Sequence, residues 1–254
     1  MTHPYAARRA AFRALHAEGC FALPNPWDAG SARRLEELGF KALASTSAGM
    51  AWALGKDDGK VTRDEVIDHL RMLCAATDLP VNADFEAGFA ETAQGVGESV
   101  TLAIEAGVAG LSIEDWSGSA LYDLPTAVAR IKAARAAIDA SGQDVVLVGR
   151  SEGFLRGAPD LAATIERLQA YAEAGADCLY APAVTAPDDI RAIVEAVAPR
   201  PVNVLQWGPD MTVQSLAALG VRRVSTGAAL AAAAWAGFDA AAKALSDQGG
   251  EQGA

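Results

Sequence analysis

The sequence predicts a (β/α)₈ barrel, or TIM barrel, an α/β fold in which eight parallel strands alternate with helices. A recurring pattern points to it: a helical segment ends at a glycine and an apolar run begins within a few residues, as at Gly39, Gly107, Gly175 and Gly220. The first three glycines are evenly spaced, because 107 − 39 and 175 − 107 both equal 68 residues. This spacing corresponds to two strand–helix units of about 34 residues each.

The third observation is that the chain contains eight short apolar runs, most of them ending in polar residues, as buried parallel strands do in this fold. We expect strands over residues 20–24, 42–47, 81–86, 110–115, 145–151, 178–182, 202–205 and 223–226. Helical patterns fill the gaps, for example over residues 63–76, 92–106, 127–140, 161–174 and 188–197. Asp160 and Thr212 are placed to cap helix starts.

Two connections are longer than the usual βα loop: residues 48–61 and residues 116–125. Such loops at the C-terminal face of a barrel are where lids and specificity elements are expected. A chain of 254 residues matches one barrel, so we predict a single domain over residues 1–246. Residues 247–254 are rich in Gly and Gln, and we expect a disordered tail there.

Composition excludes several classes of protein. A net charge of −11 without a basic stripe argues against nucleic-acid binding. Cys20, Cys74 and Cys178 show no zinc or redox spacing and are expected to be reduced, buried residues of a cytoplasmic protein. The N-terminus lacks the apolar region of a signal peptide, and the Ala-rich stretch 228–242 is too polar for a membrane span.

Carboxylates at two neighbouring strand ends predict a metal site. Asp84 and Glu86 are two residues apart, so a strand would direct both to the same side, and either Glu114 or Asp115 could join them from the next strand. Three hard oxygen ligands suit Mg²⁺, which binds a few carboxylates together with waters and substrate oxygens. The alternative is that these acids cap helices or are solvated loop charges.

Other polar and aromatic residues stand at the same ends of the expected strands. They are Asn25, Trp27 and Asp28; Ser45, Thr46 and Ser47; Arg150 and Glu152; Tyr180; Asn203, Gln206 and Trp207; and Ser225 and Thr226. Arg150 suits the binding of a substrate carboxylate, or alternatively a salt bridge with one of the acids. Thr46 and Ser47 could offer N–H groups or hydroxyls to a substrate oxyanion, or could serve turn formation.

The three histidines, His3, His16 and His69, fall outside the strand ends, and so do the cysteines. A histidine base or a thiol nucleophile is therefore not expected. The remaining way to stabilise negative charge is a metal aided by Arg and hydroxyl groups. This combination suits the enolate of a 2-oxo acid.

The sequence resembles the isocitrate lyase/phosphoenolpyruvate mutase superfamily over nearly the whole chain, on its phosphoenolpyruvate mutase-like side. The resemblance rests on the order and spacing of NPWDAGSA (25–32), TSAG (46–49), LGKDDG (54–59), DFEAGF (84–89), SIED (112–115) and GRSE (149–152). It implies a barrel whose last helix, here residues 228–245, is exchanged between the protomers of a homodimer or homotetramer. It also implies Mg²⁺ and a small 2-oxo carboxylate or its enolate.

By this resemblance Asp84 is the direct metal ligand, while Glu86 and Glu114 hold metal-bound waters. Arg150 resembles the clamp for the substrate carboxylate, and Asp58 an acid on a substrate-facing loop. The backbone of Thr46, Ser47 and Ala48 resembles the oxyanion-binding segment; Trp27 and Asn203 complete the expected substrate contacts. Asp58 and Tyr180 are the candidate proton donors.

The sequence departs from two branches of the superfamily. Isocitrate and methylisocitrate lyases carry a Lys-x-Cys-Gly-His signature after the Glu-Asp pair, whereas residues 116–123 here read WSGSALYD. Phosphonopyruvate mutases carry a His near the end of strand six, where this chain has Tyr180-Ala181-Pro182. Both differences argue against those particular activities.

Three functions follow as hypotheses. The first is a Mg²⁺-dependent lyase or hydrolase acting on a small 2-oxo or 2-hydroxy (di)carboxylate, with oxaloacetate-like substrates first. The second is cleavage or rearrangement of a carbon–phosphorus bond. The third is a barrel that binds 2-oxo acids without turnover.

Overall fold

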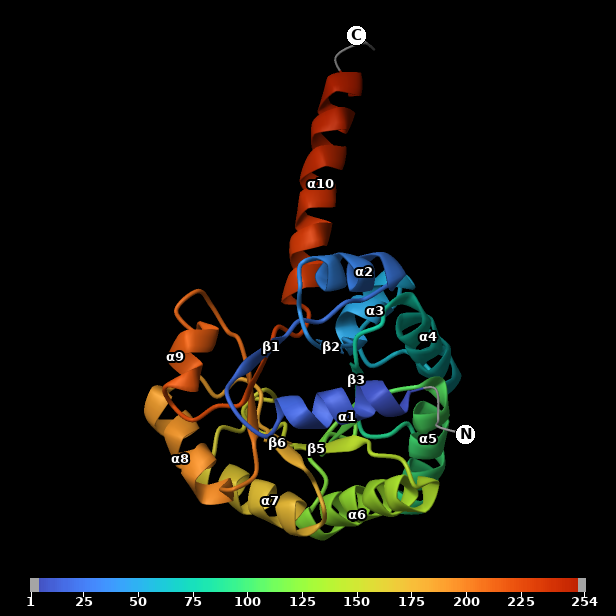
Figure 1. The fold of residues 1–254 in the computed structure, drawn as a ribbon. Coiled ribbons are helices and arrows are strands. Elements are labelled where there is room, and N and C mark those ends of the chain that lie inside the picture. Colours follow the sequence, from blue (N-terminus) through green and yellow to red (C-terminus); the bar gives the residue numbers. More distant parts are fainter. Residues whose placement is uncertain (1–4, 251–254) are drawn as a thin grey trace.

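The computed structural model describes residues 5–250 and shows eight parallel strands ringed by helices (Figure 1). The strands are β1 (Phe21–Leu23), β2 (Leu43–Ala44), β3 (Val81–Asp84), β4 (Gly110–Glu114), β5 (Val146–Arg150), β6 (Cys178–Tyr180), β7 (Val202–Leu205) and β8 (Arg223–Ser225). All eight lie within the predicted runs. The predicted (β/α)₈ barrel is confirmed.

The helices alternate with the strands along the chain. They are α1 (Ala6–Leu15), α2 (Ala29–Glu37), α3 (Ser47–Ala53), α4 (Arg63–Ala76), α5 (Ala93–Ala106), α6 (Leu124–Ser141), α7 (Leu161–Glu173), α8 (Pro187–Val197), α9 (Val213–Ala217) and α10 (Ala229–Gly250). Asp160 and Thr212 cap α7 and α9 as predicted, each accepting a hydrogen bond from a backbone N–H in the first turn.

The strands pair in the order β1-β8-β7-β6-β5-β4-β3-β2. β1 and β2 meet through single bonds: the Ala44 N–H donates to Pro24 O at 3.0 Å, and the Asn25 side chain donates to Ser45 O at 2.8 Å. These bonds close the seam, so the carboxyl ends of the strands form one continuous rim. The interior and the layer between strands and helices are filled by buried aliphatic side chains such as Leu111, Leu147 and Leu179.

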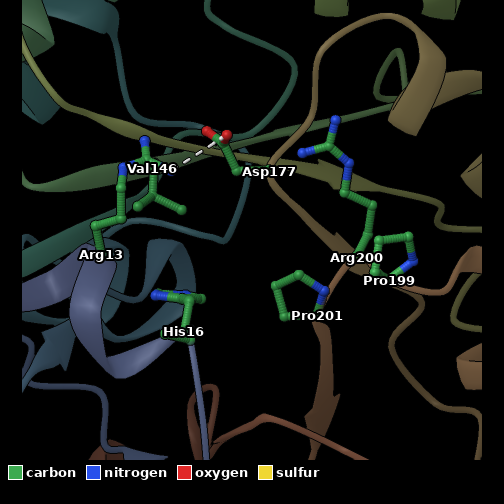
Figure 2. A pocket seen from close by; sticks show the side chains of 8 residues that line it. Arg13, His16, Val146, Asp177, Pro199, Arg200 and Pro201 are labelled. Atoms are coloured by element: carbon green, nitrogen blue, oxygen red, sulfur yellow. Dashed lines mark hydrogen bonds and ion pairs between the residues drawn. The ribbon is translucent and has the colours of Figure 1, made fainter.

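Helix α1 lies across the N-terminal end of the barrel (Figure 1). Phe12 is fully buried there, and Arg9 donates to the carbonyl oxygens of Val108 and Ile104 at 3.0 and 2.7 Å. Beside α1 a cavity of about 400 Å³ is lined by Arg13, His16 and residues of the turn before β7 (Figure 2). Arg13 pairs there with Asp177 at 3.3 Å and also with Asp144.

Two local predictions are wrong. The connection 48–61 is not a simple loop, because Thr46 accepts a hydrogen bond from the Gly49 N–H and starts helix α3. Asp28 is not a strand-end site residue: it caps α2 in a reciprocal arrangement with Ser31. The predicted tail begins at residue 247, while helix α10 continues to Gly250; residues 251–254 lie outside the described part.

Helix α10 leaves the ring and projects away from the barrel (Figure 1). Trp235, Phe238 and Leu245 on it are 38, 63 and 72% exposed, which leaves large apolar side chains without cover in a single chain. No helix within residues 5–250 is long and apolar enough to cross a membrane.

Candidate active site at the C-terminal end of the barrel

A cavity of about 700 Å³ opens at the C-terminal end of β3, β4 and β5. Five of the predicted site residues line it together: Ser47, Asp58, Glu86, Glu114 and Arg150. The remaining lining comes from the segment between α3 and α4, from the loops after these strands and from one residue of α6: Gly59, Lys60, Ala87, Phe89, Ala90, Glu91, Trp116, Ser117, Gly118, Tyr122, Arg130, Leu155 and Arg156. The location is the one at which barrels of this class carry their chemistry.

Arg150, the last residue of β5, is the central cation of this site. Its Nη1 lies 3.1 Å from Asp84 Oδ1 and 3.5 Å from Glu114 Oε2, and its Nε donates to Glu152 Oε1 at 2.5 Å. Burial would lower the pKa of Arg150, but Glu114, Glu152 and Asp84 together raise it well above its ordinary value. Arg150 therefore remains charged. This charge is compatible with both roles predicted for Arg150 from the sequence: a salt bridge with the nearby acids and the binding of a substrate carboxylate.

Asp84 ends β3 and has both carboxylate oxygens engaged. Oδ1 pairs with Arg150, and Oδ2 accepts the Ser47 N–H at 3.1 Å. The Asp84 N–H in turn donates to Ser45 Oγ at 2.9 Å. These contacts fix the Asp84 carboxylate between the segment after β2 and the Arg150 side chain from the end of β5.

Glu86 reaches the same cavity by a different route from the one predicted. The strand ends at Asp84, and Glu86 has a φ of +44°, a left-handed conformation that is uncommon outside glycine. The alternation rule used to pair it with Asp84 therefore does not apply. Its Oε1 is buried without a hydrogen-bond partner among the described residues. Burial, followed by the nearby charges of Asp84 and Asp58, raises the pKa of Glu86 to about 7.

Glu114 completes the acidic group from the end of β4. It is 7% exposed, and burial raises its pKa well above its ordinary value. Arg150 opposes that rise, whereas the negative charges of Glu152, Asp84 and Glu86 add to it. Several carboxylates thus crowd one buried region with more negative charge than Arg150 alone balances.

The unpartnered Glu86 oxygen and the raised carboxyl pKa values fit a divalent cation at this place, since such a cation would neutralise the excess charge. Within residues 5–250, however, no three acidic, His or Cys side chains converge as a ready-made cage. Asp84 is held by Arg150 and Ser47 instead. The arrangement therefore suits a cation with few direct protein ligands and several waters, which is the preference of Mg²⁺.

Asp115 faces away from the cavity, so only Glu114 of the adjacent pair joins the site. Asp115 Oδ1 accepts the Glu152 N–H at 2.8 Å, and Oδ2 accepts from the Tyr171 hydroxyl at 2.7 Å and from Arg167 at 3.1 Å. This network fixes the chain immediately after β5. Glu152, which has no exposed surface, then presents its carboxylate to Arg150 and Arg156.

Arg130 of α6 holds the acidic loop. Its guanidinium donates to Ala87 O at 2.5 Å, Ala90 O at 2.7 Å and Glu91 O at 3.1 Å, and it lies 4.5 Å from the centre of the Tyr122 ring. The left-handed turn that delivers Glu86 is thereby tied to the 116–123 segment. Sequence analysis missed Arg130 and Arg156; it placed Glu152 at a strand end beside Arg150 but assigned it no role.

The other predicted substrate contacts lie outside the cavity lining. Trp27 lines a separate, mainly apolar cavity of about 370 Å³ between α3 and α4. Asn203 is buried in the barrel interior, donating to Ser225 Oγ at 3.0 Å and accepting from Arg223 at 2.9 Å. Thr46 is occupied as the cap of α3, and Ala48 lies in its first turn.

Tyr180 lies beneath the site. Its ring is 5.2 Å from the Arg150 guanidinium carbon. Burial raises the pKa of Tyr180 to about 12, although Arg150 and Ser225 act in the opposite direction. Tyr180 is therefore protonated at neutral pH. It can donate a proton but cannot serve as a base.

A comparison with known protein families identifies the family of this chain. The family model for phosphoenolpyruvate phosphomutase matches residues 12–246. The chain belongs to this family. The match runs over the whole barrel and most of α10, so it includes every residue of the cavity lining.

Members of the phosphoenolpyruvate phosphomutase family and its wider superfamily resemble the chain closely. The 2-methylisocitrate lyase of Escherichia coli is 34% identical over 212 residues, covering 78% of this chain and 70% of that protein. The oxaloacetate decarboxylase of Rhodopseudomonas palustris is 32% identical over 246 residues, covering 92 and 83%. The solved structure of oxaloacetate acetylhydrolase with its product oxalate has a TM-score of 0.89 and 27% identity, covering 98% of this chain and 89% of that one. The predicted membership in this superfamily of enzymes is confirmed.

One segment of this family member differs from the pattern expected of the methylisocitrate lyases. Trp116 and Leu121 form an isolated antiparallel β-bridge, so this segment folds back on itself in a short turn. Residues 116–123 contain no Cys or His. Trp116, Ser117 and Gly118 nevertheless line the cavity. The cavity thus combines the charged residues Glu86, Glu114 and Arg150 with Trp116 and the small residues Ser117 and Gly118.

Proposed function

We propose that the chain is a Mg²⁺-dependent lyase or hydrolase acting on a small 2-oxo or 2-hydroxy (di)carboxylate, with oxaloacetate-like substrates first. One observation carries the proposal: Glu86, Glu114 and the charged Arg150 line one cavity, and Arg150 pairs there with Glu114 at 3.5 Å and with Asp84 at 3.1 Å. The activities named for the oxaloacetate decarboxylase and oxaloacetate acetylhydrolase relatives support the substrate class.

Asp84 would hold the cation directly, and Glu86 and Glu114 would hold its waters. A divalent cation there supplies positive charge next to an oxygen on which negative charge develops. The raised pKa values of Glu86 and Glu114 support this assignment, because a nearby cation would allow both to ionise.

The protein's own groups would position and protect the substrate. Arg150 binds the C1 carboxylate as a charged, fixed donor. The Ser47 N–H is already used by Asp84, so the Ser47 hydroxyl and the Ala48 N–H are the donors left for a substrate oxyanion. Asp58 at the exposed rim and the protonated Tyr180 are the two candidate proton donors.

The experiment is NMR of oxaloacetate incubated with the protein, with and without Mg²⁺, against a blank without protein. The blank corrects for unaided and metal-catalysed decarboxylation. We expect Mg²⁺-dependent consumption above the blank. Pyruvate as product means decarboxylation, whereas oxalate plus acetate means attack of water on the oxo carbon. No consumption above the blank would contradict the proposal.

A second candidate is cleavage or rearrangement of a carbon–phosphorus bond, favoured by the name of the matching family model. Phosphonopyruvate in the same assay, followed by ³¹P NMR, tests it. Conversion of phosphonopyruvate in place of oxaloacetate would establish this second function. Tight oxalate binding without turnover of either compound would instead favour a 2-oxo-acid-binding protein.

We also propose that the chain forms a homodimer or homotetramer through α10. The exposed Trp235, Phe238 and Leu245 on a helix that stands away from its own barrel support this. Size-exclusion chromatography with light scattering tests the proposal. Truncation before α10 should yield a monomer or insoluble protein.

A further inference from the structure

The cavity contains a second arginine that no catalytic assignment uses. Arg156 lies in the turn after β5, lines the cavity and keeps about one third of its side chain exposed. Its backbone N–H and its Nε both bond to Glu152, at 3.0 Å to the carbonyl and 2.9 Å to Oε2. The residue is therefore anchored at two points.

Its guanidinium is also held from the side by an aromatic face. The guanidinium carbon lies 4.8 Å from the centre of the Trp116 ring, on the segment that forms the cavity rim. Such cation–π contact orients an arginine without using its N–H donors. The ion pair with Glu114 is long, at 3.9 Å from Nη2 to Oε1, and Nη1 has no partner among the described residues. Arg156 thus presents free donors to the cavity.

Arg150 and Arg156 form a matched pair. The two oxygens of the buried Glu152 carboxylate each hold one of them, Oε1 binding Arg150 and Oε2 binding Arg156. The two oxygens of Glu114 face the same two guanidinium groups. The cavity therefore places two cations side by side at fixed separation, one deep and one at the rim.

We propose that Arg156 binds a second carboxylate of the substrate, at the end opposite the carboxylate held by Arg150. This inference rests on the proposed function and extends it, because it selects dicarboxylates over monocarboxylates that share the same 2-oxo or 2-hydroxy head. An arginine fixed by a carboxylate and an aromatic ring is pre-organised for planar, two-pronged binding of a carboxylate.

The test uses two stable probes with the same head group, L-malate and L-lactate, titrated calorimetrically in the presence of Mg²⁺. They differ by one carboxylate. The wild-type protein should bind malate at least about tenfold more tightly than lactate, as expected for one charge-assisted contact. Arg156→Gln should weaken malate binding by about 10- to 30-fold and change lactate binding less than about twofold.

Two further variants sharpen the result. Arg156→Lys should recover part of the malate preference, because it restores charge without the planar donor pair. Arg191→Gln removes one positive charge from an exposed residue of α8 that does not line the cavity, and it should keep the malate-to-lactate ratio of the wild type. Unchanged lactate binding also shows that each variant is folded.

The possible failures are distinguishable. If Arg156→Gln weakens both probes equally, or neither, while the wild type binds both, Arg156 does not hold a second carboxylate and the proposed function stands. If the wild type binds neither probe with Mg²⁺, the proposed function fails, and this inference fails with it.

Discussion

The two ends of the barrel both place arginines beside carboxylates, but the charges are balanced differently. At the N-terminal end Arg13 lies between Asp144 and Asp177, and Arg9 is satisfied mainly by backbone carbonyls of the barrel floor (Figure 2 shows Arg13 and Asp177). His16 beside them is held neutral, because burial and then Arg223 lower its pKa to about 3. At this end, both Arg9 and Arg13 thus have protein partners beside α1.

At the C-terminal end the balance is incomplete. Arg150 faces Asp84, Glu114 and Glu152 at once, while Glu86 has an unpartnered buried oxygen and a pKa raised to about 7 by burial and by Asp84. Excess negative charge that the fold does not neutralise is a cost that a purely structural network would avoid. The comparison teaches that residual charge, more than the presence of ion pairs, distinguishes the end that we propose to bind ligands.

The largest expected effect is on catalytic activity, which a substitution at the C-terminal end of the barrel should lower and one at the N-terminal end should not. Asp84→Asn should lower kcat/KM for the substrate found by NMR by about 10³-fold or more, since a lost cation contact costs several kcal/mol of transition-state stabilisation. Asp144→Asn, at the other end and half exposed, should retain wild-type activity. Steady-state kinetics over a Mg²⁺ series measures both, and full Mg²⁺ dependence and rate in Asp84→Asn would overturn the metal assignment.

The second prediction compares stability. Arg150→Gln leaves buried carboxylates without their cation and should lower the free energy of unfolding by about 3 kcal/mol. Arg13→Gln should cost about 1 kcal/mol or less, because its side chain is 39% exposed and its pairs are screened by water. Urea denaturation at neutral pH measures both. Equal losses would show that the two ion-pair networks contribute equally to the free energy of unfolding.

The third prediction concerns the pH dependence of stability without metal. Glu86 has a folded-state pKa of about 7, above its ordinary 4.5, so the folded protein binds more protons than the unfolded chain between these values. The free energy of unfolding should therefore fall as pH rises from 4.5 to 7, by about 2 kcal/mol from this group. Glu86→Gln should flatten the curve in that range. A wild-type slope retained in Glu86→Gln would assign it to another group.

The fourth and smallest effect has the opposite sign and belongs to the other end. His16 has a folded-state pKa of about 3, below its ordinary 6.5, so the unfolded chain binds more protons between these values. Its contribution to stability is complete above pH 6.5 and is lost as pH falls, by about 1 kcal/mol between pH 6.5 and 5. Thermal unfolding of His16→Gln against wild type over this range should show a shallower decline on the acid side. A decline as steep as that of the wild type would place the titration elsewhere.

The sequence alone determined the architecture and most of the strand ends. Eight apolar runs, the glycine pattern and the 68-residue spacing were enough to predict them. A parallel barrel buries every strand on both faces, so each strand appears in the sequence as a continuous apolar run. The candidate acids and Arg150 could then be predicted, because a charged residue at the end of a buried strand lies at the C-terminal end of the barrel in this fold.

Only the tertiary structure decided which of these groups meet and what holds them. Glu86 lines the cavity through a left-handed turn tied down by Arg130, 44 residues further along the chain (130 − 86), and no periodicity encodes that contact. Trp27 and Asn203 share strand-end positions with the others, yet one lines a separate cavity and the other is bonded inside the barrel. Arg156 stands out only beside Glu152 and Trp116, because an arginine acquires its role from the partners that fix its guanidinium, and those partners converge only when the chain is folded.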